Sequence, residues 1–149
     1  MDPKKRVMVL KEFKFHHGFR VRCSEVDAQG IVFNAHYLTY FDTALTEFFR
    51  AIDYNYQVHV EDTGNDFHVV KSLIEYKQPI PFDMEIDVHV GVAKLGRSSI
   101  TFALQIHPKG EENLLCEGEI VWVNAERETK KSAPINDKLR MKLQQHSFV

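Results

Sequence analysis

The sequence has only two cysteines among its 149 residues, no long apolar run and no excess of charge of one sign. Cys23 and Cys116 are far apart and form no Cys-x-x-Cys pair, which argues against a disulfide framework or a zinc knuckle. No apolar run approaches the roughly 20 residues of a membrane span. Because 19 Lys and Arg residues balance 21 Asp and Glu residues, the protein has no strong net charge that would favour binding to nucleic acid or an anionic membrane. We therefore expect a cytoplasmic protein without a metal site.

Signatures of several enzyme classes are also absent. The sequence contains no Gly-x-Ser-x-Gly, no His-Glu-x-x-His, no Gly-x-Gly-x-x-Gly and no P-loop, and its eight histidines are scattered. These absences argue against an α/β-type serine hydrolase, a zinc hydrolase and a nucleotide-binding fold. The basic start, residues 1–6, precedes too few apolar residues for a signal peptide, so we expect a solvated terminus.

The hydrophobic pattern predicts an α+β domain of one long helix and about five strands. Apolar residues make up 44% and charged residues 27%, as in ordinary globular chains. The predicted strands span residues 13–23, 67–76, 84–92, 100–106 and 114–123. Residues 94–97 separate two of them as the turn of a hairpin. We expect residues 1–149 to form one domain, with a core of about 13–125 and a short C-terminal helix or tail at 133–149.

The predicted helix, residues 37–52, carries its apolar side chains at helical spacing. Tyr37 and Leu38 begin this face, whereas Asp42 and Arg50 lie outside it. A single helix with so many large apolar residues needs a surface that buries them. We therefore expect an antiparallel sheet curled around the helix.

Two segments resemble one family of enzymes. The first is Asp27-x-x-Gly30-Ile31-Val32, followed by Asn34 and Tyr37, and the second is the strand-hairpin-strand at residues 92–102. Both resemble hotdog-fold thioesterases of the 4-hydroxybenzoyl-CoA thioesterase and YbgC-like group. The resemblance implies a sheet wrapped around the helix, a homodimer or a tetramer of dimers, and active sites at the subunit boundary. It also implies hydrolysis of an acyl-CoA thioester with Asp27 as general base or nucleophile, without a cofactor, since CoA is part of the substrate.

The chemistry of a thioester fits this reading, because the leaving group is good and one base with one amide donor can suffice. Asp27 precedes the predicted helix, and we expect a backbone N–H within residues 34–37 to bind the carbonyl oxygen. Spacing alone would make Asp27 an ordinary turn residue. The side chain of Asn34 either orients water or the carbonyl or bonds its own backbone, and His36 either assists proton transfer or is a packing or capping residue. We expect Gly30 to be needed for a backbone conformation or a close approach to the ligand, and Tyr37 to contact substrate.

Coenzyme A would bring an anionic nucleotide, for which the hairpin offers charge and hydroxyl groups: Lys94, Arg97, Ser98 and Ser99. Without the resemblance, these residues would form only a solvated turn. Relatives often carry His in place of Asn34 and Tyr in place of Cys23, which keeps open a hotdog protein that binds an acyl thioester without hydrolysing it. A dehydratase on the same fold has less support, since no matching His motif is present. Both cysteines are expected to be buried and inert in strand faces.

Overall fold

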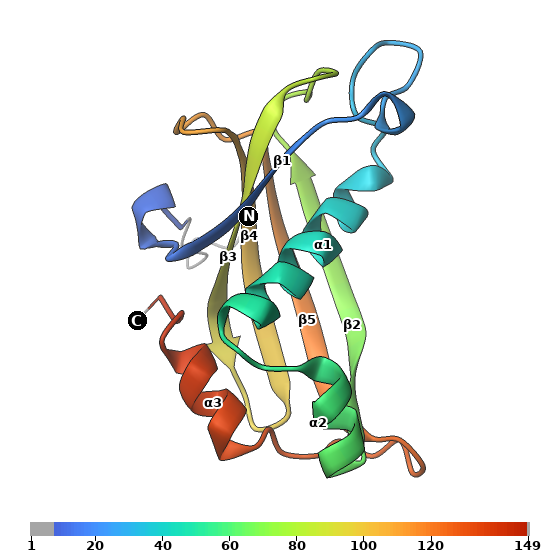
Figure 1. Ribbon diagram of the computed structural model, residues 1–149, viewed down its shortest axis with the longest axis vertical. Coiled ribbons are helices and arrows are strands. Elements are labelled where there is room, and N and C mark those ends of the chain that lie inside the picture. The colour runs from blue at the N-terminus through green and yellow to red at the C-terminus, as the bar shows by residue number, and fades with distance from the viewer. Residues whose placement is uncertain (1–7, 149) are drawn as a thin grey trace.

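The computed structural model describes residues 8–148 (Figure 1). The basic residues 1–6 lie outside this range. The elements in chain order are η1 (Leu10–Glu12), β1 (Phe15–Arg20), η2 (Cys23–Glu25), α1 (His36–Ala51), α2 (Tyr56–Thr63), β2 (Asn65–Tyr76), β3 (Glu85–Leu95), β4 (Ser99–Pro108), β5 (Cys116–Glu126) and α3 (Asp137–Gln144).

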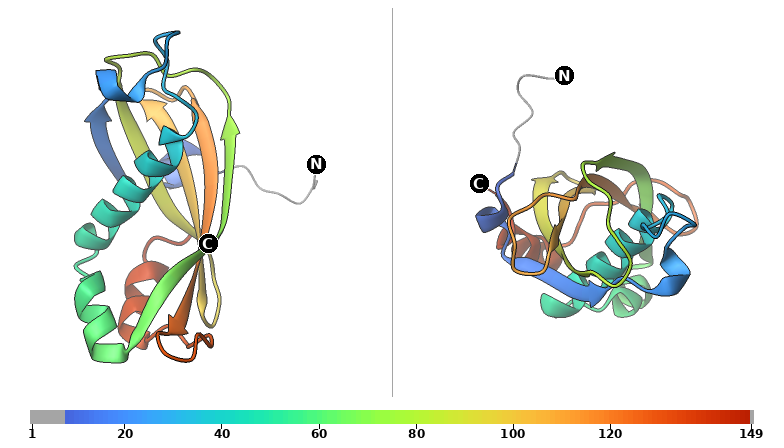
Figure 2. Two further views of the ribbon diagram at one scale, coloured as in Figure 1. Left: turned by 90° about the vertical axis from the view of Figure 1, so that its right-hand side faces the viewer. Right: turned by 90° about the horizontal axis from the view of Figure 1, so that it is seen from above.

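The five strands form one antiparallel sheet in the order β1-β3-β4-β5-β2. The predicted hairpin is confirmed: β3 pairs with β4 up to Leu95 and Ile100, and the Gly96 N–H donates to the Ser99 carbonyl at 2.8 Å. Figure 2 shows the sheet curling around the helices, with α1 across its concave side. The predicted α+β class, a sheet wrapped around one long helix, is thus confirmed. Among residues 8–148, β1 and β2 are the edge strands.

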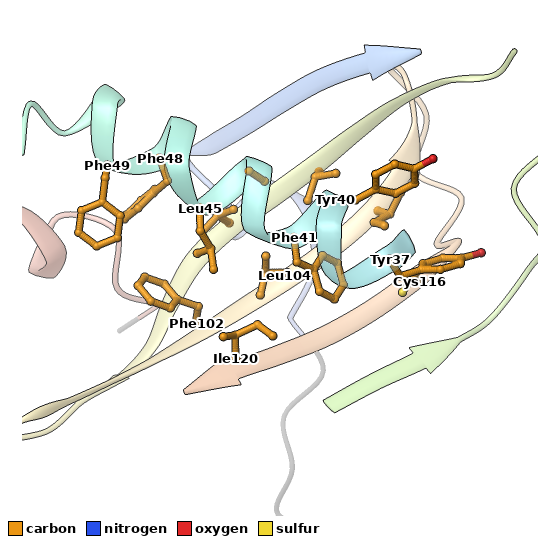
Figure 3. Packing of buried hydrophobic residues seen from close by; sticks show 14 of the residues in the cluster. Tyr37, Tyr40, Phe41, Leu45, Phe48, Phe49, Phe102, Leu104, Cys116 and Ile120 are labelled. Atoms are coloured by element: carbon orange, nitrogen blue, oxygen red, sulfur yellow. The ribbon is translucent and has the colours of Figure 1, made fainter. Parts of the chain in front are cut away.

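Helix α1 buries a stripe of mostly aromatic side chains against the sheet (Figure 3). The buried residues are Tyr37, Tyr40, Phe41, Ala44, Leu45, Phe48 and Phe49. Gly118 of β5 lets the helix approach closely, because a Cβ there would lie 2.3 Å from Cε2 of Phe41. Leu38 was expected on this face, but it is 43% exposed. Its angle about the helix axis is that of the stripe, between Leu45 and Phe49, but Leu38 lines an open groove of about 260 Å³ instead of the core, so the expected burial is wrong.

Helix α2 lies between the predicted helix at residues 37–52 and the predicted strand at residues 67–76, where the sequence pattern indicated no element. Its ends carry ordinary capping signals: Oδ1 of Asn55 accepts from the Val58 N–H at 3.1 Å, and Gly64 has φ 71°. Its only buried residue is His59. A helix with one buried side chain has no apolar stripe, so hydrophobic periodicity could not reveal it.

Both ends of the described chain pack on β3. The Val92 N–H donates to the carbonyl of His146 beyond α3, at 3.0 Å. On the convex face of the sheet, the ring of Phe13 lies 5.9 Å from that of His89. Burial, with the charges of His107 and His16, lowers the pKa of His89 to about 4. No helix within residues 8–148 is both long and apolar enough to cross a membrane.

Candidate active site

The segment between β1 and α1 folds into a tight turn that carries Asp27. The Asp27 N–H donates to the Ile31 carbonyl at 2.9 Å, and the Gly30 N–H donates back to the Asp27 carbonyl at 3.0 Å. Gly30 has φ 76°, a conformation that favours glycine, as its expected backbone role requires. Isolated bridges between Val26 and Val32 and between Ile31 and Pro81 hold the turn at both sides. The turn is therefore rigid backbone rather than an open loop.

The carboxylate of Asp27 is oriented by its own turn. Its Oδ1 accepts the Gln29 N–H at 2.8 Å. Asp27 lines an open cavity of about 390 Å³ that Asn34 and Tyr37 also line. Three of the residues expected to act on substrate therefore meet in one cavity. The expected His36 and Gly30 flank this cavity in sequence but do not line it.

The start of α1 faces the same region and has no side-chain cap. Ala35 precedes the helix and supplies no acceptor, while the His36 N–H donates to the Phe33 carbonyl at 2.9 Å. A helix start carries partial positive charge from its amide groups. Because Asn34 and Tyr37 bracket this start and line the cavity, developing negative charge in the cavity would meet a favourable field.

Two residues from the end of β2 complete the cavity wall, and sequence reasoning missed the role of both. The Tyr76 hydroxyl donates to the Asn34 carbonyl at 3.1 Å, and its ring meets that of Tyr37 edge-on at 4.8 Å. Burial raises the pKa of Tyr37 to about 12, so its hydroxyl stays protonated at neutral pH. Lys77 also lines the cavity, with Nζ 3.3 Å from Oε2 of Glu75. Charged residues at strand ends are common, so nothing in the sequence distinguished Lys77 as a site residue.

Glu25 forms a second polar group beneath the turn that the motif comparison did not single out. Its carboxylate is buried and accepts from the Arg22 backbone N–H at 2.8 Å, from Arg22 Nε at 3.0 Å and from the Tyr40 hydroxyl at 3.0 Å. Burial by itself would raise the pKa of Glu25, but the bonds from Arg22 and Tyr40 outweigh it and hold the pKa below its ordinary value. A glutamate three residues after an arginine, close to the motif, was the available signal.

The hairpin residues expected to bind coenzyme A lie at the other end of the domain. Strand β3 begins at Glu85, beside the Asp27 turn, where the Phe82 N–H donates to the Gly30 carbonyl at 2.9 Å. It ends at Leu95, and a strand of this length spans about 35 Å. Lys94, Arg97, Ser98 and Ser99 lie at or just beyond that far end. Within one chain they do not join Asp27.

The two cysteines differ in their surroundings. Cys116 is fully buried, and burial raises the pKa of its thiol to about 12, so the thiol is protonated at neutral pH. Cys23 is exposed and lies in η2. The expectation of a buried strand position is wrong for Cys23, because β1 already ends at Arg20.

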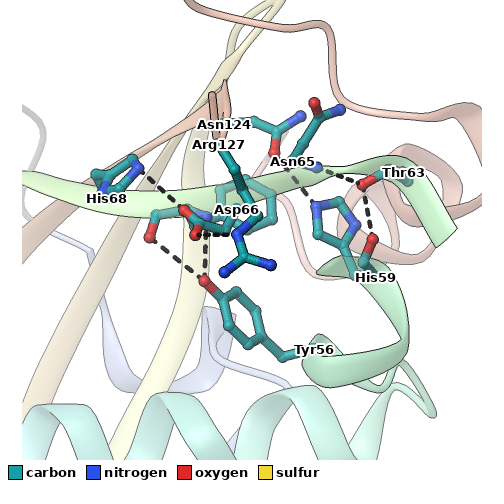
Figure 4. A network of polar contacts seen from close by, with 9 residues as sticks. Tyr56, His59, Thr63, Asn65, Asp66, His68, Asn124 and Arg127 are labelled. Carbon is teal, nitrogen blue, oxygen red and sulfur yellow. Dashed lines mark hydrogen bonds and ion pairs between the residues drawn. The ribbon is translucent and has the colours of Figure 1, made fainter. Parts of the chain in front are cut away.

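Larger cavities lie away from Asp27. One of about 800 Å³, near the polar network of Figure 4, has a charged lining that includes Asp66, Arg127 and Lys130. Asp66 already pairs with His68 and Arg127, at 2.9 and 3.8 Å. Within residues 8–148, no cluster of His, Cys, Asp and Glu has the arrangement of a metal site.

Comparison with known proteins identifies the family. A model of the thioesterase-like superfamily matches residues 21–143. The chain belongs to this superfamily. The match covers the Asp27 turn, α1 and the whole of β2 to β5, and it confirms the predicted class of thioester hydrolase. Known relatives include an acyl-CoA thioester hydrolase YbgC of Escherichia coli, 28% identical over 73% of this chain and 80% of its own length. A protein of Aquifex aeolicus, named only provisionally as an esterase, is 36% identical over 56% of this chain, and the matched region spans 65% of that relative.

Solved structures agree on the fold. A protein of Pseudomonas aeruginosa is 25% identical and superposes with a TM-score of 0.81 over 92% of this chain and 94% of its own. The 1,4-dihydroxy-2-naphthoyl-CoA thioesterase of Synechocystis has the same TM-score over 87% of this chain and 95% of its own, at 15% identity. The hotdog fold expected from the two motifs is thereby confirmed.

Proposed function

We propose that this protein hydrolyses an acyl-CoA thioester to the free acid and CoA, and that the Asp27 carboxylate drives the reaction. The observation that carries the proposal is the position of Asp27, on a rigid turn lining an open cavity beside the uncapped start of α1. A base and a source of positive potential thus face one cavity, which is the minimum that thioester hydrolysis needs.

The reaction then proceeds with few protein groups. Asp27 takes a proton from water while the water oxygen attacks the carbonyl carbon, or Asp27 attacks directly and water later cleaves the acyl-enzyme anhydride. The amides at the start of α1 stabilise the negative carbonyl oxygen. The carbon–sulfur bond breaks and CoA leaves as thiolate, which recovers the proton. Asn34 orients the water or the carbonyl, Tyr37 contacts the acyl group, and His36 contributes less because it does not line the cavity.

We further propose that the site is completed in a homodimer through the edge of β2. Val69 and Val70 on this edge are each 59% exposed. An edge strand that exposes apolar side chains without a partner strand is unusual in a natural protein. Tyr76, at one end of β2, contacts Asn34, while Asn65 begins the other end. The hairpin lies toward the Asn65 end, since the Asn124 N–H donates to the Ser98 carbonyl at 2.7 Å.

Antiparallel pairing of two β2 strands would therefore place the hairpin of one subunit near the Asp27 turn of the other. Lys94, Arg97, Ser98 and Ser99 of one subunit would then bind the nucleotide of a substrate whose thioester lies at Asp27 of its partner. Mixing an Asp27→Asn chain with an Arg97→Ala chain tests this arrangement, because each mixed dimer contains one site with both native residues. Recovered activity at low substrate concentration supports a shared site, and no recovery in a mixture shown to exchange subunits contradicts it. A tetramer of dimers remains compatible with this pairing.

A binding protein without turnover is the second candidate, favoured by Asn34 and Cys23, where relatives often carry His and Tyr. Release of free thiol from short, medium, long and aromatic acyl-CoA thioesters separates the two functions. We expect release from at least one substrate. Tight binding with no release from any of them would favour the binding protein. The cytoplasmic location and the absence of a cofactor stay predictions.

A further inference from the structure

We propose that Glu25 is a positioning residue for hydrolysis: its buried carboxylate, held between Arg22 and Tyr40, fixes the turn of Asp27 against α1. The inference rests on the proposed role of Asp27. Glu25 itself does not line the cavity, so it would act only through the geometry of the groups that do.

The contacts of Glu25 join three segments of the site. Its side chain is bonded by Arg22, which follows β1, and by Tyr40, one turn into α1. Its backbone carbonyl accepts the Phe33 N–H at 2.9 Å. Glu25 directly precedes the bridged pair Val26 and Val32, and Phe33 directly follows it. Glu25 therefore closes the Asp27 turn where it begins and ends, and it connects this turn to α1, whose first amide groups face the cavity.

The balance of forces suggests that stability alone does not explain this carboxylate. Glu25 is 5% exposed and Tyr40 is 1% exposed, so both polar groups have lost most of their water. The bonds from Arg22 and Tyr40 outweigh the desolvation of the Glu25 charge, but well-packed apolar side chains in place of a buried charged network are often just as stable. Apolar packing does not impose a fixed orientation on its neighbours. The two carboxylate oxygens of Glu25 do so, because they fix the relative placement of Arg22 and Tyr40 through hydrogen bonds of defined geometry.

Tyrosine-to-phenylalanine substitutions give a matched test, because each removes one hydroxyl and little volume. Tyr40→Phe removes the bond to Glu25. The control Tyr54→Phe removes a hydroxyl that bonds His59 Nδ1 at 2.5 Å and Asn136 Nδ2 at 2.9 Å, at the far end of the subunit. We expect Tyr40→Phe to lower kcat by roughly 10- to 100-fold with KM within about twofold, as for a small displacement of a catalytic group. Tyr54→Phe should keep the native kcat. Equal kcat values for both folded variants would overturn the inference.

A double-mutant cycle separates positioning from a general structural effect. Glu25→Gln keeps the shape of the side chain but places an amide N–H₂ against the Arg22 guanidinium or Tyr40. We expect it to lower kcat in the native chain and to have little further effect on the residual rate of Asp27→Asn, since positioning matters only when the carboxylate is present. The same fold-loss in both backgrounds would show that Glu25 acts independently of Asp27.

The cycle also separates this inference from the proposed function. If Asp27→Asn retained the native rate, the assignment of Asp27 would fail, and the positioning role would fail with it. If Asp27→Asn lost activity while Tyr40→Phe and Glu25→Gln kept it, only the positioning role would be overturned. Should Glu25→Gln not fold, the comparison of Tyr40→Phe with Tyr54→Phe still decides.

Discussion

Replacing Asp27 with asparagine removes the negative charge and the proton acceptor while leaving the turn in place. In the native turn, Oδ1 of Asp27 accepts one hydrogen bond, from the Gln29 N–H. An asparagine Oδ1 can accept the same bond. The other bonds of the turn, to Ile31 and from Gly30, involve only the backbone of Asp27. The substitution should therefore change the free energy of unfolding by less than about 1 kcal/mol.

The expected kinetic loss is much larger than this structural cost. General acid–base catalysis contributes about 10²–10⁴-fold, so kcat should fall by that factor, which corresponds to about 2.7–5.5 kcal/mol of lost transition-state stabilisation. KM should change little, because the carboxylate stabilises the transition state more than the bound substrate. A turn residue without a catalytic role would instead leave kcat unchanged and show only the small structural cost.

Thiol release from the best acyl-CoA substrate measures kcat and KM, and urea unfolding measures the stability of the same preparation. Asp62→Asn is a matched control, because it removes an exposed carboxylate on α2, at the other end of the subunit. We expect the control to keep the native kcat. A folded Asp27→Asn protein that hydrolyses its substrate at the native rate would refute the mechanism, although not the fold.

Three further predictions address binding, packing and pH. Arg97→Ala should raise KM for acyl-CoA far more than it lowers kcat, and this effect should vanish on a pantetheine thioester without the nucleotide; equal loss on both would indicate a structural role. Gly118→Ala should lower stability in urea by about 1–3 kcal/mol, because its Cβ would overlap Phe41, and Phe41→Leu should recover part of the loss. The pKa of His89 is lowered from 6.5 to about 4 in the folded protein, so the unfolded chain binds a proton first as pH falls. The free energy of unfolding should therefore decrease between pH 6.5 and about pH 4. His89→Gln should make this decrease smaller. After allowance for partial exposure this term is about 1–2 kcal/mol, and identical pH profiles of the two proteins would contradict it.

The strands and the long helix could be predicted because their side chains alternate between core and solvent with clear periods. Residues 84–92 and 100–106 have a period of two in their apolar side chains, whereas β3 continues to Leu95 past a register shift between Val92 and Lys94, which the pattern could not show. Residues 37–52 carry the helical period because one stripe of α1 faces the sheet. Helix α2 escaped this reasoning, since its ends are fixed by Asn55 and Gly64 rather than by a buried stripe.

The site could be predicted only where it is local in sequence. Asp27, Asn34 and Tyr37 lie within a short segment, so a turn followed by a helix brings them to one cavity without reference to the rest of the chain. Tyr76 and Lys77 reach the same cavity from the end of β2, and their placement depends on the strand order of the sheet. Hydrophobic periodicity identifies strands but does not give that order, so these two residues could not be assigned from the pattern.

The parts of the site differ in what holds them. The Asp27 turn and the start of α1 are fixed within one subunit, by backbone bonds and by the contacts of Glu25 with Arg22 and Tyr40. The hairpin is about 35 Å away along β3, and in the proposed dimer it would approach Asp27 from the partner subunit. In the proposed dimer, chemistry is therefore preorganised inside each chain, whereas binding of the coenzyme depends on assembly. Loosening the β2 edge should accordingly weaken substrate binding before it impairs the chemical step, which is the reverse of the order expected for changes around Glu25.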